Sequence, residues 1–349
     1  MTHVIVLRFS AMGDVLMTLP VIDSFARQHP DVRVTVVSRP WAQPLFSLLP
    51  SNVGFMAADL KGEHAGYHGL NLLARRLFAL QPTHIADLHD VLRTKWLRMR
   101  LHIAGHHVAH IRKDRRARKA FLSAEVKVPQ TSMFEKYVDV FRRLGFDDWS
   151  LDFKSLYPQG GADLSTAVPS FDPSLRPELH WVAIAPFSIH DGKTYPQEQM
   201  EEVIRQLNAR GDTRIFLFGA GKTESDILSQ WAERYAYAEN MAGKLNNIAE
   251  ELALISHCQV MVSMDSGNMH LAALAAVPVV SIWGATHPYA GFLGYHQKLD
   301  NVLQRTDLPC RPCSIYGDKP CQFGDYRCLT GITPEAVVEK VSAIVCANA

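Results

Sequence analysis

The chain has 349 residues, of which 47% are hydrophobic and 20% charged, an ordinary composition for a globular protein. Its formal net charge of +1 gives no general attraction for nucleic acid, and no apolar run approaches the ~20 residues that cross a bilayer. A single core seldom grows beyond about 250–300 residues, so the length favours two domains. The N-terminus lacks signal-peptide features, and six cysteines without such a signal favour a reducing cytoplasm.

The first half of the chain alternates between apolar strands and amphipathic helices. Strands are predicted at residues 3–9, 32–38, 53–57, 83–88 and 106–111. Helices are predicted at residues 15–28, 41–48, 70–80, 93–103 and 134–144. Continuous apolar strands between helices are typical of a parallel sheet that is covered on both faces.

Between residues 157 and 179 this alternation stops and proline and glycine become frequent, which indicates an interdomain linker. Strands are then predicted at 181–185, 214–218, 259–263 and 279–283, and helices at 197–209, 222–235, 248–256, 268–276 and 334–346. The sequence therefore predicts an α/β protein with Rossmann-like domains at 1–165 and 180–333 and a C-terminal helix at 334–349. We expect the domains to face a central cleft, with ligand loops at the carboxyl ends of the strands.

The first β–α loop, Ser10-Ala-Met-Gly-Asp14, supplies a carboxylate at the carboxyl end of the first strand. Gly13 permits a tight turn, and Asp14 stands at or near the start of the next helix. Asp14 is therefore either an N-cap or a general base for a ligand in the cleft. The loop lacks the full Gly-x-Gly-x-x-Gly pattern, which argues against dinucleotide binding.

Two loops of the second half carry polar side chains at one edge of the second predicted sheet. Ser188 and Lys193 follow the strand at 181–185, and Lys193 is either a partner for a diphosphate leaving group or a solvated lysine. Glu224 follows the next strand after two glycines. It either binds a ribose hydroxyl or supplies a favourable charge in the first turn of a helix.

The stretch Asp265-Ser-Gly-Asn-Met-His270 joins a predicted strand to a predicted helix. A helix entered through Asp265, Ser266 and Gly267 presents unpaired backbone N–H groups, which suit a phosphate or diphosphate. An ordinary capped helix is the commoner meaning of one Asp-Ser-Gly. His270 stands out among the sixteen histidines because it would lie beside a diphosphate at this turn.

Four segments in this order resemble glycosyltransferase family 9, the ADP-heptose:lipopolysaccharide heptosyltransferases, and the resemblance spans essentially the whole chain. They are "SAMGDVLMTLP" at 10–20, "GKTYP" at 192–196, "GAGKTE" at 219–224 and "MDSGNMHLAALAAVPVVSIWGATHP" at 264–288. The resemblance, which is to the heptosyltransferase II type, implies the GT-B fold. In that fold the N-terminal domain binds the acceptor and the C-terminal domain binds the nucleotide sugar.

The resemblance also assigns roles. Asp14 matches the catalytic base, and Lys193 matches a phosphate-contacting catalytic lysine. The donor-binding residues implied are Ser188, Lys193, Glu224, Asp265, Ser266, Gly267 and His270. The segment "DLHDVLRTKWLRMR" at 87–100 resembles the acceptor side, so the acceptor-binding candidates are Gly13, Arg93 and Arg112.

By this resemblance the chain is an inverting transferase that moves heptose from ADP-heptose to the lipid-linked lipopolysaccharide inner core. It requires no catalytic cofactor and no nucleic acid, and it works in the cytoplasm. Two alternatives stay open: transfer from another nucleotide sugar or to another acceptor glycan, and nucleotide-sugar binding without catalysis. The joint presence of Asp14, Lys193 and Asp265 argues against the second.

The run from Arg112 to Lys119 holds six cations and one anion. It is either a solvated face or a patch for an anionic acceptor or the inner-membrane surface, to which the enzyme would be peripheral.

Four cysteines fall in a turn-rich loop at 310–328, namely Cys310, Cys313, Cys321 and Cys328. The first pair has the x2 spacing of a structural zinc site, whereas the second pair is wider than usual. The alternative is a set of reduced thiols or an adventitious disulfide.

Overall fold

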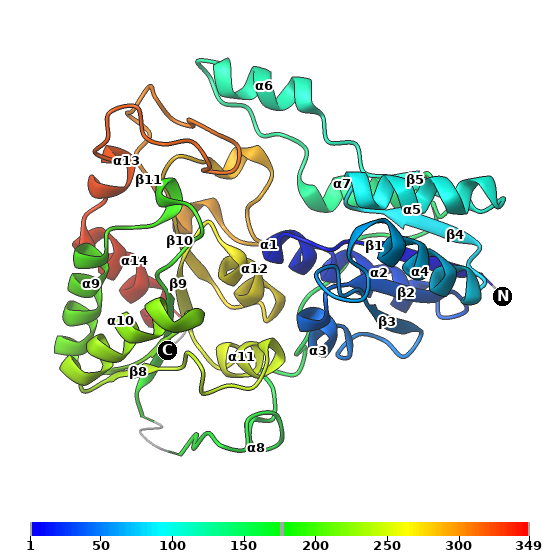
Figure 1. Cartoon of the computed structure of the whole chain (residues 1–349). Coiled ribbons are helices and arrows are strands. Elements are labelled where there is room, and N and C mark those ends of the chain that lie inside the picture. The colour runs from blue at the N-terminus through cyan, green and yellow to red at the C-terminus, as the bar shows by residue number, and fades with distance from the viewer. Residues whose placement is uncertain (1, 175–177, 348–349) are drawn as a thin grey trace. The chain divides into compact units, whose positions relative to one another are not determined.

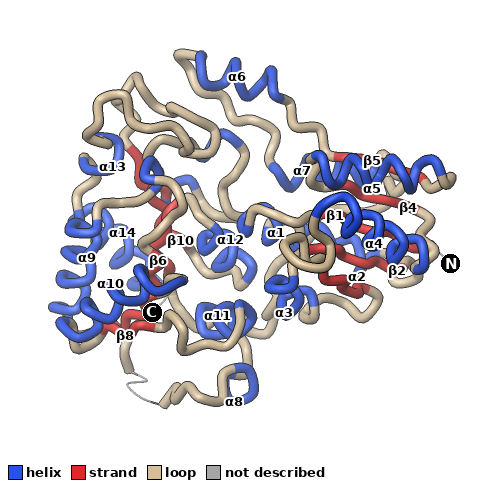
Figure 2. The backbone as a smooth tube through the Cα atoms, in the orientation of Figure 1, coloured by secondary structure: helices blue, strands red, loops and turns tan. Residues whose placement is uncertain are grey.

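The computed structural model describes residues 2–174 and 178–347. The chain divides into two compact units, which we call unit 1 (Met1–Lys113 and Thr131–Leu156) and unit 2 (Asp114–Gln130 and Tyr157–Ala349). Each unit is built on one parallel β-sheet, and Figure 2 shows the strands of each unit among its helices. The predicted α/β fold with two parallel-sheet domains is confirmed.

Unit 1 contains a five-stranded sheet in the order β3-β2-β1-β4-β5. Its strands are β1 (His3–Leu7), β2 (Arg33–Ser38), β3 (Val53–Ala57), β4 (His84–Asp87) and β5 (His107–His110). Its helices are α1 (Met12–Leu16), α2 (Leu19–Gln28), α3 (Gln43–Phe46), α4 (Gly66–Ala79), α5 (Leu92–Ile103) and α7 (Met133–Arg142), with a 3-10 turn η1 (Pro40–Ala42). Because β1 lies between β2 and β4, the strand order reverses there, and ligands of such sheets bind at the carboxyl ends of the strands at this point.

Unit 2 contains a six-stranded sheet in the order β11-β10-β9-β6-β7-β8. Its strands are β6 (His180–Ala185), β7 (Thr213–Leu217), β8 (Ala238–Asn240), β9 (Val260–Met264), β10 (Val279–Trp283) and β11 (Val302–Gln304). Its α-helices are α6 (Arg115–Ser123), α8 (Leu164–Ala167), α9 (Gln197–Arg210), α10 (Gly221–Arg234), α11 (Ile248–Ile255), α12 (Gly267–Leu274), α13 (Arg327–Thr330) and α14 (Pro334–Ala347). Three 3-10 turns complete it, η2 (Asp191–Lys193), η3 (Pro288–Ala290) and η4 (Leu299–Asn301). The order reverses between β6 and β9.

The core of unit 2 follows from the alternation of side chains along its strands. Val182 and Ile184 of β6, with every second residue of β7 and β9, pack against α9, α10 and α14. Figure 1 shows these three helices on one side of the sheet and α11 and α12 on the other. The central strand β9 is buried along its whole length, as expected for a sheet with two covered faces.

The structure differs from the predicted elements in the first helix. The predicted helix at 15–28 is two helices, α1 and α2, because Pro20 occupies the first turn of α2 and has no N–H to continue a longer helix. Five helices and strands of the described residues, α6, α8, β8, β11 and α13, were not predicted, since each is short or polar. Part of the predicted linker (175–177) and the last residues of the predicted C-terminal helix (348–349) lie outside the described residues.

Residues 114–130 form a segment that belongs to unit 2, although the sequence alone groups them with the N-terminal domain. Phe121 of α6 is buried in a cluster with Ala290 and Ile315. The Gln130 backbone N–H donates to the carbonyl of Tyr289 at 2.8 Å. These contacts were invisible to sequence reasoning because they join positions far apart in the chain.

Candidate functional site

The reversal of strand order in unit 2 brings together two of the predicted donor residues. Lys193, in the turn η2 after β6, places its Nζ 2.9 Å from Oδ2 of Asp265, which directly follows β9. Thr286, after β10, donates its hydroxyl to the same oxygen at 2.8 Å. Asp265 is 5% exposed and Thr286 1%, so the carboxylate is removed from water with two donors on one of its oxygens. Such a pair is stable only while both partners are present.

The helix α12 begins beside this cluster. Ser266 is its N-cap residue without a side-chain cap bond, and Gly267 is its first residue, so the first turn presents backbone N–H groups. The Ser266 hydroxyl lies 3.3 Å from that of Ser263. His270 is buried in the same helix at 5% exposure. The structure thus gathers Asp265, Ser266, Gly267 and His270 with Lys193 at one edge of the sheet.

Ser188 and Glu224 follow the neighbouring strands β6 and β7. The carbonyl of Ser188 accepts a bond from the Thr194 hydroxyl at 3.3 Å, which shapes the loop that carries Lys193. Oε2 of Glu224 accepts the Ala220 N–H at 2.7 Å, at the start of α10. Glu224 therefore holds the backbone at the start of its own helix, a contact compatible with either of its two predicted roles.

Arg311, which the sequence did not single out, organises the loop after β10. It is 6% exposed, and its guanidinium donates to the carbonyls of Thr286 at 2.8 Å and Trp283 at 3.0 Å, and to that of Gly284. Burial lowers the pKa of this guanidinium from its ordinary value. The Cys-rich loop thereby holds the segment that carries Thr286.

Gly317, in the same Cys-rich loop, has a φ of +77° and lies against the stem of Lys193, where a Cβ would collide with its Cγ. A glycine is therefore required beside the lysine on grounds of both space and backbone conformation.

The four cysteines of this loop are all free thiols. Across the described residues, 2–174 and 178–347, no group of three or more His, Cys, Asp or Glu side chains is arranged to hold a metal ion. Burial raises the pKa of the Cys321 thiol, but backbone N–H groups of Phe323 and its neighbours outweigh burial and leave that pKa below its ordinary value. The geometry as it stands gives no support to the predicted zinc site.

In unit 1, Asp14 lies in the short helix α1 at the carboxyl end of β1. Its Oδ2 is 2.6 Å from Nη2 of Arg8 and accepts the Ala11 N–H at 3.2 Å. The Asp14 side chain is 22% exposed, whereas that of Arg8 is 7% exposed. The carboxylate therefore has one oxygen fixed by the protein and keeps access to solvent.

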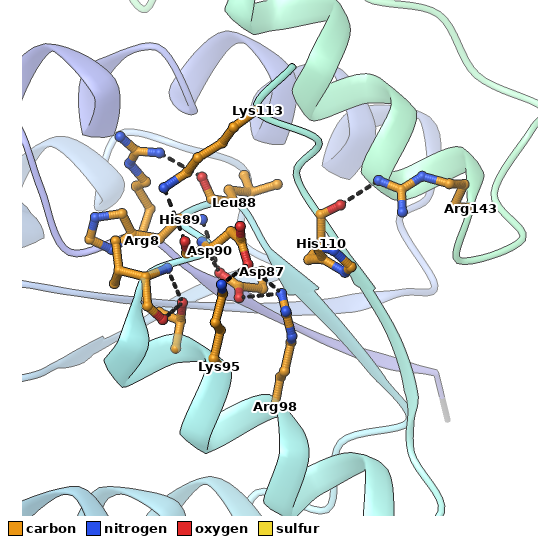
Figure 3. A network of polar contacts seen from close by, with 12 residues as sticks. Arg8, Asp87, Leu88, His89, Asp90, Lys95, Arg98, His110, Lys113 and Arg143 are labelled. Carbon is orange, nitrogen blue, oxygen red and sulfur yellow. Dashed lines mark hydrogen bonds and ion pairs between the residues drawn. The ribbon is translucent and has the colours of Figure 1, made fainter. Parts of the chain in front are cut away.

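A polar network follows the neighbouring strand β4 (Figure 3). Asp87 is fully buried, and its Oδ1 accepts the backbone N–H groups of His89 at 2.9 Å and Asp90 at 2.8 Å. Its Oδ2 accepts from Arg98 at 3.0 Å, and Arg98 also pairs with Asp90 at 3.1 Å. Burial, together with nearby Arg8 and other cations, lowers the pKa of His89 to about 3, so this ring is neutral near pH 7.

The predicted acceptor residues follow three adjacent strands of unit 1. Gly13 comes after β1, Arg93 lies in the first turn of α5 after β4, and Arg112 comes after β5. Both arginines are exposed. All three residues lie at the carboxyl edge of the sheet, but within the described ranges 2–174 and 178–347 no hydrogen bond or ion pair joins them to one another.

Several residues that contact the predicted site residues had no predicted role, among them Arg8, Thr286 and Arg311. Arg8 directly follows the apolar strand β1, as Asp265 follows β9, and Thr286 lies in the loop after β10. A polar residue just after an apolar strand was the signal that could have found them. Arg311 lies between Cys310 and Cys313, and no strand end or motif marks it in the sequence.

The model of glycosyltransferase family 9 (heptosyltransferase) matches residues 72–322. Lipopolysaccharide heptosyltransferase 2 of Escherichia coli K12 is 23% identical, and 98% of each chain is covered. Lipooligosaccharide heptosyltransferase 2 of Campylobacter jejuni (strain 81116) is 26% identical over 149 residues, 40% of this chain and 43% of the relative. The match to that relative thus spans about two fifths of its length. Asp14 lies outside the residues that the family model matches.

Among solved structures, E. coli ADP-heptose lipopolysaccharide heptosyltransferase II shares the fold, with a TM-score of 0.72, 20% identity and coverage of 100% of this chain and 99% of the other. The resemblance inferred from the four sequence segments is confirmed.

Proposed function

Because the chain belongs to glycosyltransferase family 9, we propose that it transfers heptose from ADP-heptose to the inner core of lipopolysaccharide. The names of relatives that cover nearly the whole chain support this donor and this acceptor. The observation that carries the proposal is the cluster of Lys193, Asp265 and Thr286 beside the start of α12. A cation and a row of backbone N–H groups at one edge of a parallel sheet suit a nucleotide diphosphate.

On the donor side, Lys193 and the first turn of α12 neutralise the charge that develops on the departing ADP. An ammonium group has three N–H donors, so Lys193 can keep Asp265 and still bind a phosphate oxygen. Asp265 repels phosphate and accepts hydrogen bonds, which suits it to hydroxyls of the heptose. Ser188, Ser266, Gly267 and His270 complete the donor site, and the Glu224 carboxylate takes a ribose hydroxyl.

On the acceptor side, Asp14 removes the proton from the attacking hydroxyl, with Gly13, Arg93 and Arg112 as acceptor contacts. The hydroxyl oxygen bonds to the anomeric carbon as the bond from that carbon to the diphosphate breaks. One base and one displacement give inversion at that carbon and need no covalent enzyme intermediate.

We propose further that the acceptor is lipid-linked and that the enzyme works at the cytoplasmic face of the inner membrane. In the described part of the chain, no helix is long and apolar enough to span a bilayer. The segment 114–130 instead exposes cations together with two valines, Val126 at 77% and Val128 at 62%. Its exposed cations are Arg115, Arg116 and Lys119. Cations and apolar side chains on one exposed segment favour an anionic bilayer surface.

A donor screen tests the reaction. Purified protein is mixed with a truncated lipopolysaccharide acceptor and either ADP-heptose or a UDP-sugar, and nucleotide release is followed. We expect release of ADP from ADP-heptose that depends on the acceptor and falls about 10²–10⁴-fold in Asp14→Asn, whose ADP affinity stays near wild type. Turnover with the UDP-sugar alone, or none with either donor, would reject the proposed function.

A further inference from the structure

Arg8 is a buried arginine at the carboxyl end of β1, and its guanidinium joins two neighbouring loops. It is 5% exposed. Nη1 donates to the carbonyl of Leu88 at 2.6 Å, after β4, and Nη2 contacts Oδ2 of Asp14 at 2.6 Å. Figure 3 shows Arg8 pointing toward Leu88, beside His89. Arg8 is therefore held from one side and itself holds the carboxylate of Asp14.

Two other ionisable groups near Arg8, Asp87 and His89, are already compensated. Asp87 is bound by Arg98 and two backbone N–H groups, as described above. His89 is neutral near pH 7 and accepts the Phe9 N–H at its Nδ1, 3.4 Å away. Since a buried cation needs an anionic partner, the charge of Arg8 is directed to Asp14.

The two oxygens of Asp14 have different surroundings. Oδ2 takes both the Arg8 contact and the Ala11 N–H, which fixes the plane of the carboxylate. Within residues 2–174 and 178–347, no hydrogen bond or ion pair reaches Oδ1. The hydroxyl of Tyr137 donates to the Asp14 carbonyl at 3.2 Å and so holds the backbone of the same residue.

We propose that Arg8 is a positioning residue for the general base: it holds Oδ2 of Asp14 so that Oδ1 receives the proton of the acceptor hydroxyl. The inference rests on the proposed function, because it assumes that Asp14 is the base. Oδ2 keeps its bond to Arg8 when Oδ1 takes the proton, so the carboxyl group does not turn during transfer. A reacting group misplaced by about 1 Å can cost about 10²-fold in rate.

The test compares Arg8→Met, Arg8→Lys, Asp14→Asn and the double variant Arg8→Met/Asp14→Asn. Steady-state assays use ADP-heptose and a truncated lipopolysaccharide acceptor. Arg98→Met is the matched control, since Arg98 is also a partly buried arginine of unit 1 but pairs with Asp87 and Asp90. Circular dichroism and thermal melting establish that each variant is folded before its kinetics are compared.

We expect Arg8→Met to lower kcat by about 10²-fold while the KM for ADP-heptose changes less than about threefold. Arg8→Lys should recover at least about tenfold of that loss, because an ammonium can still reach Oδ2. The double variant should be no slower than Asp14→Asn. Arg8 acts only through Asp14, so both changes remove the same function.

Two results would overturn the inference. One is a kcat for folded Arg8→Met within about threefold of the wild-type value, with Asp14→Asn inactive. The other is a multiplicative loss in the double variant. Wild-type turnover in Asp14→Asn would instead remove the proposed role of Asp14 itself, so the two failures are distinguishable.

Discussion

Lys193 and Asp265 form an ion pair of 2.9 Å between the ends of β6 and β9, the two strands at which the order of the second sheet reverses. Removing one partner leaves the other charge buried and unmatched. The pair therefore ties the predicted phosphate-binding cation to the loop that starts α12.

Replacement of Lys193 by alanine should weaken donor binding and turnover together. We expect kcat/KM for ADP-heptose to fall about 10²–10³-fold, since a charge that stabilises the leaving group is lost. Calorimetric titration with ADP and steady-state kinetics measure the two effects. Lys222→Ala is the control, because that lysine is 88% exposed and pairs with Asp226 on the surface. An effect limited to the KM of the acceptor would contradict this role.

Charge reversal on the segment 114–130 should release the protein from anionic vesicles. We expect the triple change Arg115→Glu, Arg116→Glu and Lys119→Glu to abolish sedimentation with phosphatidylglycerol-containing vesicles, at about 1 kcal/mol per cation. Val126→Asp should weaken the binding to vesicles, because an apolar contact with the bilayer is lost. The control set changes three exposed lysines of other segments to glutamate, namely Lys61, Lys244 and Lys298. It alters the net charge by the same amount. Equal release by this control set would show that the segment is not the contact.

Loss of Arg311 should destabilise unit 2 and displace Thr286. Arg311→Met leaves several buried carbonyls without donors, so we expect the free energy of unfolding to fall by about 2–4 kcal/mol. Arg311→Lys should lower the free energy of unfolding by a smaller amount. Urea denaturation followed by tryptophan fluorescence measures the change. A midpoint equal to that of wild type would mean that solvent satisfies these carbonyls.

Glu251 in α11 should make stability depend on pH. Burial raises the pKa of its carboxyl group to about 7, above the ordinary value of 4.5. The folded state therefore holds a proton that the unfolded state releases above pH 4.5, and stability falls as pH rises from about 4.5 to about 7. Relative to Glu251→Gln, the wild type should lose about 1–3 kcal/mol over this window. If the free energy of unfolding varies with pH in the same way in both proteins, this role of Glu251 is refuted.

The zinc site predicted from the spacing of Cys310, Cys313, Cys321 and Cys328 remains to be tested. If the site exists, we expect one zinc per chain in protein purified under reducing conditions. The double variant Cys310→Ser/Cys313→Ser should lose this zinc. Elemental analysis by mass spectrometry decides it, with Cys346→Ser as control, because that cysteine is exposed on α14. Freshly reduced protein without stoichiometric zinc would favour the alternative of plain thiols.

Much of the fold was predictable because the apolar strands of both sheets are buried and stand out from the helices between them. Asp265 was predictable for the same reason, since a polar residue directly after a buried strand marks the carboxyl edge of a sheet. Lys193 was located to a loop, but its ion pair with Asp265 depends on the order of β6 and β9, which no local pattern contains. Arg8 and Arg311 are held by backbone carbonyls of other loops, and such partners leave no spacing in the sequence.

The segment 114–130 makes the two units inseparable by any single cut of the chain. Its neighbours on both sides, residues 1–113 and 131–156, belong to unit 1. A fragment ending at 156 would carry Phe121 away from Ala290 and Ile315 and expose an apolar side chain that is 3% exposed in the whole chain. A fragment beginning at 157 would uncover Ala290 and Ile315. Half-molecule preparations are therefore predicted to need this segment transplanted onto the C-terminal part by a designed fusion.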